Sequence, residues 1–210
     1  MFVLTADQVG SRDSADLVAA LLPHLAERFG AQLALPPDRN AGDEVQALTA
    51  DAATALEMAL LLTRTGHWSV GVGVGEVREP LPGSVREATG PAFVAAREAV
   101  DQAKRASHRF ALASSGAGLL SAAEVGALME LVLAVRARRS EEGWEVVDLL
   151  ESGRTQSAAA QQLGITPQAV SLRVAAAQWR AEAAAVPALV VLLDDLDRGG
   201  RGGSTAGVPS

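Results

Sequence analysis

A segment in the last third of the chain, Thr155–Val174, constrains the fold more than any other part of the sequence. It predicts two short helices joined by a tight turn at Gly164, because glycine adopts backbone angles that other residues avoid. Two helices that cross steeply need small residues at their contact, and Ala159 and Ala160 supply them. Thr166 followed by proline is typical of a helix start, with a cap residue and then proline in the first turn. The segment therefore predicts a helical domain without strands.

This pair of helices resembles a bacterial helix-turn-helix of the sigma-factor-like and MarR-like kind. The resemblance implies that double-stranded DNA is a partner. The charge of this segment agrees with DNA binding, since no acidic residue occurs from Ser152 to Arg180 although the chain has a net charge of −7. A helix that enters the major groove cannot turn carboxylates toward phosphates. The alternative is a pair of ordinary core helices joined by a tight turn.

The residues expected to contact DNA fall into two groups. Outward side chains of the second helix are expected at base edges, where glutamine suits adenine and arginine suits guanine. Residues near the helix starts are better placed for phosphates. The DNA-binding candidates are Arg154, Thr155, Thr166, Gln168, Ser171, Leu172 and Arg173.

The first half of the chain alternates strands with helices. Two of the strands flank a polar turn that contains proline and glycine, which predicts a β-hairpin. The order of elements predicts a ferredoxin-like α+β domain, with helices on one face of a mainly antiparallel sheet. Apolar periodicity places the strands at 2–6, 32–35, 44–49, 68–77 and 109–113, and the helices at 14–29 (with Ser14 as the N-cap), 51–65 and 91–104.

After the linker Ser114–Gly118 the strand pattern stops and only helices are predicted. Pro187 is expected to interrupt the last of them. The helices are predicted at 122–139, 141–151, 155–163, 167–180 and 188–197. The predicted domains are 1–115 (α/β), 116–140 (a connecting helix), 141–185 (DNA-binding) and 186–210 (a short helix and a disordered tail).

Two acids of the first domain stand out, Asp7 just after the first strand and Asp43 in the hairpin turn. The first strand is expected beside the hairpin, so both carboxylates could meet at one sheet edge. Oxygen ligands of this kind suit a divalent cation that carries nucleotide phosphates. The alternative is that both are turn-forming, capping carboxylates.

The same residues resemble class III nucleotidyl cyclases. Leu4–Ser11 is similar to the first metal-binding strand of that family, and Arg39–Glu44 to the hairpin with the second metal-binding Asp. Trp68–Val77 is similar to the next strand, and Gly90–Arg97 to the helix that carries the catalytic Asn and Arg. The resemblance implies Mg²⁺ or Mn²⁺ at Asp7 and Asp43, with a bound nucleotide contacted by Arg39 and Arg97.

The chain departs from the cyclase pattern at Phe93, which stands where the family has its catalytic Asn. Cyclisation needs the ribose hydroxyl to be oriented and the phosphate charge to be stabilised. The resemblance therefore implies a domain that holds a nucleotide without cyclising it. Over nearly its full length, with Ala41–Gln46 and Gly143–Leu150, the chain also resembles the SatD family of bacterial proteins.

The expected function is a DNA-binding transcriptional regulator with a nucleotide- or metal-sensing domain. A nucleotide-converting enzyme with an accessory helix-turn-helix is the alternative, and an adaptor that has lost both ligands is a third. The apolar helices 122–139 and 188–197 predict a homodimer. The N-terminus does not resemble a signal peptide, and no apolar run reaches the ~18 residues of a membrane span, so a cytoplasmic location is expected.

Overall fold

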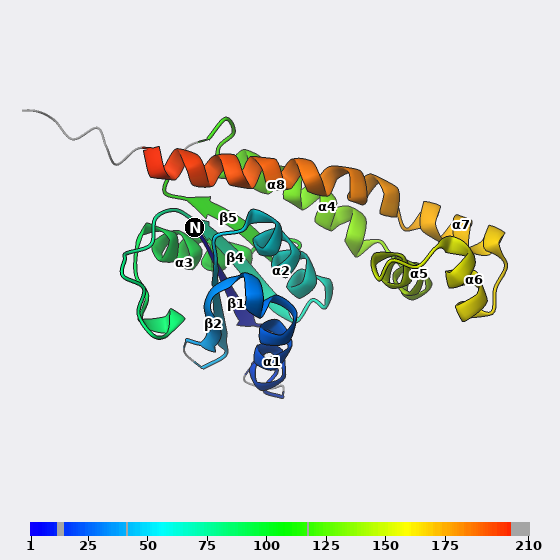
Figure 1. Cartoon of the computed structure of the whole chain (residues 1–210), viewed down its shortest axis with the longest axis horizontal. Helices are drawn as coiled ribbons and strands as arrows, with labels where there is room; N and C mark the ends of the chain where they lie inside the picture. Colours follow the sequence, from blue (N-terminus) through cyan, green and yellow to red (C-terminus); the bar gives the residue numbers. More distant parts are fainter. Residues whose placement is uncertain (12–14, 41, 117, 203–210) are drawn as a thin grey trace, which may run out of the picture. The chain divides into compact units, whose positions relative to one another are not determined.

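The computed structural model describes residues 1–11, 15–40, 42–116 and 118–202 (Figure 1). It is a mixed α+β structure, with a five-stranded sheet in the N-terminal half and mostly helices after it. The chain divides into two compact units. The first contains Met1–Glu130 and the residues from Leu189 onward, and the second contains Leu131–Ala188. Residues 12–14, which include the predicted cap Ser14, together with Ala41, Ala117 and residues 203–210, lie outside the described residues.

The sheet of the first unit is mainly antiparallel, as predicted. Its order is β2-β3-β1-β4-β5, and only β4 and β5 pair in parallel. In the register of β1 with β3, Asp7 stands opposite Glu44. The strands are β1 (Phe2–Gln8), β2 (Leu33–Arg39), β3 (Glu44–Thr49), β4 (Trp68–Val74) and β5 (Phe110–Ser114).

The helices of the first unit are α1 (Val18–Phe29), α2 (Ala52–Arg64) and α3 (Pro91–Ala103). Short 3₁₀ turns occur at Gly30–Gln32 and Val85–Glu87. The predicted start of the first helix at residue 14 was wrong. The side chain of Gln8 accepts a hydrogen bond from the backbone N–H of Leu17 and donates one to the carbonyl of Ala15. These contacts hold the chain outside the helix until Val18.

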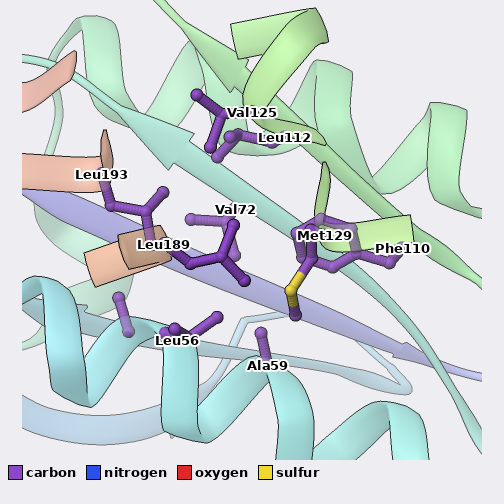
Figure 2. Close-up of a pocket in the computed structure, with 10 residues that line it drawn as sticks. Leu56, Ala59, Val72, Phe110, Leu112, Val125, Met129, Leu189 and Leu193 are labelled. Carbon is purple, nitrogen blue, oxygen red and sulfur yellow. The ribbon is translucent and has the colours of Figure 1, made fainter. Parts of the chain in front are cut away.

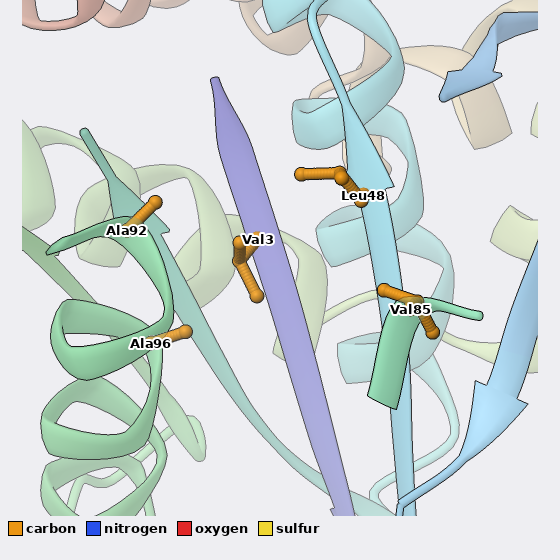
Figure 3. Packing of buried hydrophobic residues seen from close by; sticks show 5 residues of the cluster. All are labelled: Val3, Leu48, Val85, Ala92 and Ala96. Carbon is orange, nitrogen blue, oxygen red and sulfur yellow. The ribbon is translucent and has the colours of Figure 1, made fainter. Parts of the chain in front are cut away.

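Helices cover both faces of the sheet, so the prediction of one covered face was wrong. Successive residues of a strand point to opposite faces. A Cβ on Gly71 or Gly73 of β4 would lie 2.2 Å from backbone atoms of α3, so α3 lies directly on this face. The buried cluster on the same side contains Val3, Leu48, Val85, Ala92 and Ala96 (Figure 3).

The opposite face of the sheet packs on α2 together with parts of α4 (Ala122–Ala137) and α8 (Trp179–Gly202) (Figure 2). Val72 of β4 and Leu56 of α2 point into the same apolar space. The cavity left there is about 10 Å³, and only apolar side chains line it. It is therefore a packing gap with room for about one water molecule, and it offers that water no polar partner.

The edge strand β2 is longer than predicted. It continues through Pro36 and Pro37, which the sequence had placed in the turn, and ends at Arg39. Proline is tolerated on an edge strand because one side of that strand needs no ladder hydrogen bonds. The pairing with β3 shifts register between Leu35 and Asp38, where the prolines lie.

The second unit contains α5 (Glu141–Glu151), α6 (Gln156–Leu163) and α7 (Pro167–Ala176). Their shared core consists of Val146, Ala159, Ala160, Val170 and Val174. The predicted helix 167–180 was too long, because α7 ends at Ala176 and Gln178 has a φ of +53°. The next helix, α8, then begins at Trp179.

Pro187 does not interrupt α8, which continues to Gly202, so the prediction of a separate short helix at 188–197 was wrong. The rest of the predicted tail, 203–210, lies outside the described residues. Proline deprives the carbonyl four residues earlier of its helical partner. Here that residue is Ala183, and both Ala183 and Pro187 are exposed, so water can serve this carbonyl. Among the described residues, no single helix is long and apolar enough to cross a membrane, and α7 and α8 reach that length and composition only together, across a 49° bend.

Candidate functional site

The turn between α6 and α7 has the geometry that its sequence predicted. Gly164 is left-handed, with φ +66° and ψ +29°. Its N–H and that of Ile165 return to carbonyls at the end of α6, with Ile165 N 3.1 Å from the oxygen of Ala160. The hydroxyl of Thr166 accepts a hydrogen bond from Ala169 N at 3.2 Å and caps α7. Local interactions therefore fix this turn.

The exposed face of α7 is neutral. Gln168, Ser171 and Leu172 are all exposed, and Ala175 continues the same stripe one turn further along. The spacing of three, four and seven residues puts them on one side of the helix. Val170 and Val174 lie on the other side, in the core of the unit. The predicted base-facing residues, Arg173 excepted, thus form one surface.

Arg173 lies at the flank of this surface and is already paired. Its guanidinium donates to Glu145 Oε2 of α5 at 3.2 Å. Of the candidates for phosphate contact, Arg154 is exposed, and Thr155 accepts from Ala158 N at 3.2 Å as the cap of α6. The structure therefore gives Thr155 and Thr166 a capping role, and it points Arg173 toward α5.

Charge is segregated in the second unit. The exposed acids lie on α5, at Glu141, Glu142, Glu145, Asp148 and Glu151, and none occurs on α6 or α7. The exposed cations are Arg138, Arg154 and Arg180. The surface of α6 and α7 can therefore approach a polyanion without carboxylates of its own.

Sequence reasoning missed a buried charge cluster in the second unit. Arg136 and Arg139 both donate to the carboxylate of Glu182. Arg139 also donates to the carbonyl of Ala177 at 2.8 and 3.0 Å. Their guanidinium carbons lie 4.8 and 4.3 Å from the centre of the Trp144 ring. Burial lowers the pKa of Arg136, which the charge of Glu182 opposes.

Only the isolated acid could have hinted at this cluster. Glu182 stands between alanines in a segment without other carboxylates, and a single acid there requires a partner once it is buried. Its side chain is 5% exposed. Arg138, one residue from Arg139, stays exposed. The pattern of basic residues therefore did not distinguish the buried arginines that pair with Glu182 from an exposed one.

The segments of the two predicted metal ligands lie together in the first unit. The N–H of Gln8, next to Asp7, donates to the backbone carbonyl of Asp43 at 3.1 Å. Asp7 stands opposite Glu44 in the register. The carboxylate of Asp7, however, already binds the ammonium of Lys104, with Nζ 2.9 Å from Oδ2. This contact raises the pKa of Lys104.

One observation favours a divalent cation at Asp7, and two oppose it. The hydroxyl of Thr5 is buried without a hydrogen-bond partner, two residues from Asp7 on the same face of β1. Against it, Lys104 already supplies a positive charge to Asp7. Among the described residues no group of three or more Asp, Glu, His or Cys side chains is arranged to hold a metal ion. A cation would therefore have to displace Lys104.

The predicted nucleotide contacts are not gathered at one point. Arg39 is bound to Asp16 near the start of α1, with Nη2 2.6 Å from Oδ2, and to the carbonyl of Gly42 at 2.7 Å. Hydrogen bonds from Arg39 lower the pKa of Asp16. Arg97 is exposed in the middle of α3, about 10 Å along the helix axis from Lys104.

Phe93, which replaces the catalytic Asn of the cyclase pattern, is half-buried against the cluster of Val3 and Leu48. Its aromatic ring therefore has a packing role. Comparisons of the chain with protein-family models, with curated proteins and with solved structures found no match.

Proposed function

We propose that this protein is a DNA-binding transcriptional regulator and that α6 and α7 form its helix-turn-helix, with α5 as the supporting helix. The observation that carries the proposal is the neutral, exposed stripe of α7 beside a capped left-handed turn. In such motifs the second helix enters the major groove with its N-terminal residues toward the bases. Gln168 and Leu172 lie in the first two turns of α7, where that contact would occur.

For the first unit we propose a ferredoxin-like, cyclase-like sensor domain. The order β4-β1-β3-β2 and the connection β1-α1-β2-β3-α2-β4 support it, with α3 and β5 added at one edge. The ligand proposed is a nucleotide with Mg²⁺ or Mn²⁺ beside Asp7 and Asp43, on the condition that the cation displaces Lys104. Membership of the SatD family, which would join these two kinds of unit, is part of the same proposal.

A homodimer stays a prediction. Much of the apolar surface that suggested it is buried within the first unit, where Val125 and Met129 of α4 pack with Leu189 and Leu193 of α8. Leu131 of α4 remains 66% exposed. Light scattering at micromolar concentration measures the oligomeric state, and a monomeric mass contradicts the prediction.

The DNA proposal is tested by selection from a pool of random double-stranded DNA with the full chain. Enrichment of a sequence is expected, with binding then measured by fluorescence anisotropy. Gln168→Ala should weaken binding to the enriched DNA by roughly tenfold, since a lost base contact costs about 1–3 kcal/mol. Gln102→Ala is the matched control, because Gln102 is also an exposed helical glutamine but belongs to α3.

Two results would contradict the proposal. One is a pool that shows no enrichment and no salt-dependent binding. The other is equal binding by wild type, Gln168→Ala and Gln102→Ala, with all three folded by circular dichroism. The sensor proposal is separate, and its test is binding of Mn²⁺ with and without a nucleoside triphosphate.

A further inference from the structure

Leu172 is a large apolar side chain at the middle of the stripe that we assign to DNA. It is 72% exposed. A single exposed leucine is ordinary on a protein surface. Leu172 differs because it lies on a neutral helix face between small neighbours, Ser171 and Ala175, which allow DNA to approach closely.

Gln168 lies one helical turn before Leu172, on the same ridge of α7. Both side chains are exposed, and no hydrogen bond or ion pair within the described residues holds the Gln168 amide back on the protein surface. In the major groove the 5-methyl group of thymine is the apolar feature of the base edges, and adenine offers N6 and N7 to a side-chain amide. A leucine and a glutamine one turn apart thus match neighbouring A·T pairs.

Arginine is the usual reader of guanine, through O6 and N7. The one arginine of α7 is Arg173, and Glu145 of α5 holds it at the flank of the helix. Reading guanine with Arg173 would require breaking that ion pair. The exposed stripe itself offers no guanine-specific donor, since it consists of Gln168, Ser171, Leu172 and Ala175.

We propose that α7 reads A·T base pairs, with Leu172 packed on a thymine methyl group and Gln168 bound to an adenine in an adjoining pair. The inference rests on the proposed DNA-binding function and names the chemistry of its target.

The test removes the methyl group from the DNA. A sequence enriched by the full chain is synthesised with deoxyuridine in place of one thymine at a time. For wild type, one replacement should weaken binding about fourfold, which corresponds to one buried methyl group. Leu172→Ala should bind the thymine DNA more weakly and should not respond to deoxyuridine at that position. Likewise, 7-deazaadenine at one site should weaken wild type and leave Gln168→Ala unaffected.

The matched control is Leu119→Ala, because Leu119 is 84% exposed and lies in the first unit. It should bind both DNAs as wild type does. Enriched DNA to which wild type binds equally well with deoxyuridine at every position overturns the thymine contact and leaves the DNA-binding function standing. Leu172→Ala that keeps DNA affinity but lowers the mass in light scattering makes Leu172 a protein contact and also overturns it. A pool without enrichment overturns the DNA-binding function and this inference with it.

Discussion

The ammonium of Lys104 lies 2.9 Å from Oδ2 of Asp7, where the end of β1 meets the end of α3. Lys104 is the one lysine of the chain, and the other 17 of its 18 Lys and Arg residues are arginine. Asp101 and Glu44 add further negative charge around the same ammonium. Lys104 therefore acts as an internal counter-ion for three carboxylates, of which the sequence predicts one, Asp7, as a metal ligand.

Lys104→Met should strengthen the binding of Mn²⁺, because it frees the Asp7 carboxylate. The gain should be about fivefold at most, since a partly exposed ion pair contributes up to about 1 kcal/mol. Isothermal titration calorimetry measures it, and Arg105→Met, at the next residue, is the control. Failure of both variants and of wild type to bind Mn²⁺ would remove the cation from the proposed function.

The stability effect of the same variant depends on pH. The folded pKa of Lys104 is raised above its ordinary value of 10.5. Its contribution is therefore fully present below pH 10.5 and is lost as the pH rises through the folded pKa. The free energies of unfolding of wild type and Lys104→Met, measured in urea, should differ by less than about 1 kcal/mol at neutral pH. The two free energies should converge once the pH exceeds the folded pKa of Lys104.

Glu182→Gln should destabilise the second unit strongly. The substitution leaves Arg136 and Arg139 buried with no countercharge from Glu182, which costs about 3–5 kcal/mol in comparable cases. Glu145→Gln removes the exposed partner of Arg173 and should cost less than about 1 kcal/mol. Chemical unfolding followed by the fluorescence of Trp144 and Trp179 compares the two. Equal, small losses would show that Glu182 does not balance the two arginines.

Gly73→Ala in β4 should disrupt the first unit. The added Cβ would lie 2.2 Å from backbone atoms of Ala92 and Ala96, so α3 would have to move away from the sheet. Overpacking of this kind costs about 1–3 kcal/mol and occasionally more. Gly83→Ala is the control, because a Cβ added there would meet no atom within 4 Å beyond its chain neighbours and the residue is exposed. Thermal unfolding measures both variants, and an equal loss of stability in the two would contradict the close approach of α3.

Local signals made part of this structure predictable. The bounds of β3 and α5 were confirmed at Glu44–Thr49 and Glu141–Glu151, and so was the turn at Gly164. In each case the deciding interactions span a few residues, such as the hydroxyl of Ser140 that accepts from Gly143 N and begins α5. A sequence pattern contains such interactions directly.

What could not be predicted depends on residues far apart in the chain. The glycines of β4 look like poor strand residues until α3 is known to need the space. Lys104 lies 97 positions from Asp7 in the sequence, so the ion pair that occupies a predicted metal ligand could not be inferred from spacing. For the DNA candidates, outward position followed from helix periodicity, but the pairing of Arg173 with Glu145 did not.

Asp51→Ala should shorten or loosen the start of α2. The carboxylate accepts from the N–H of Thr54 at 2.8 Å and from its hydroxyl at 2.6 Å, and loss of such a cap costs about 1 kcal/mol. The pKa of Asp51 is lowered below 3.8, mostly by the hydrogen bond from the Thr54 hydroxyl and to a smaller extent by that from its N–H. The stabilisation is therefore present above pH 3.8 and lost as the pH falls through the folded pKa. Thermal melts should separate Asp51→Ala from wild type at pH 7, and equal melts there would contradict the capping role.

The salt dependence of DNA binding should be shallow. The exposed arginines of the second unit are Arg138, Arg154 and Arg180, so no more than about three phosphates can be neutralised by one copy of the unit. The logarithm of the binding constant should then fall with the logarithm of salt concentration with a slope no steeper than about −3 per protomer.

Arg154→Gln should reduce the slope by about 0.9 and weaken binding to all DNA sequences alike, because a phosphate contact carries no base information. Arg28→Gln is the control, since Arg28 is exposed and paired with Glu57 in the first unit. Fluorescence anisotropy from 50 to 200 mM salt, a range over which about 0.6 decades separate the ends, measures the slope. A much steeper slope would mean that cations of the first unit also contact DNA, and an unchanged slope for Arg154→Gln would exclude Arg154 from the phosphate contacts.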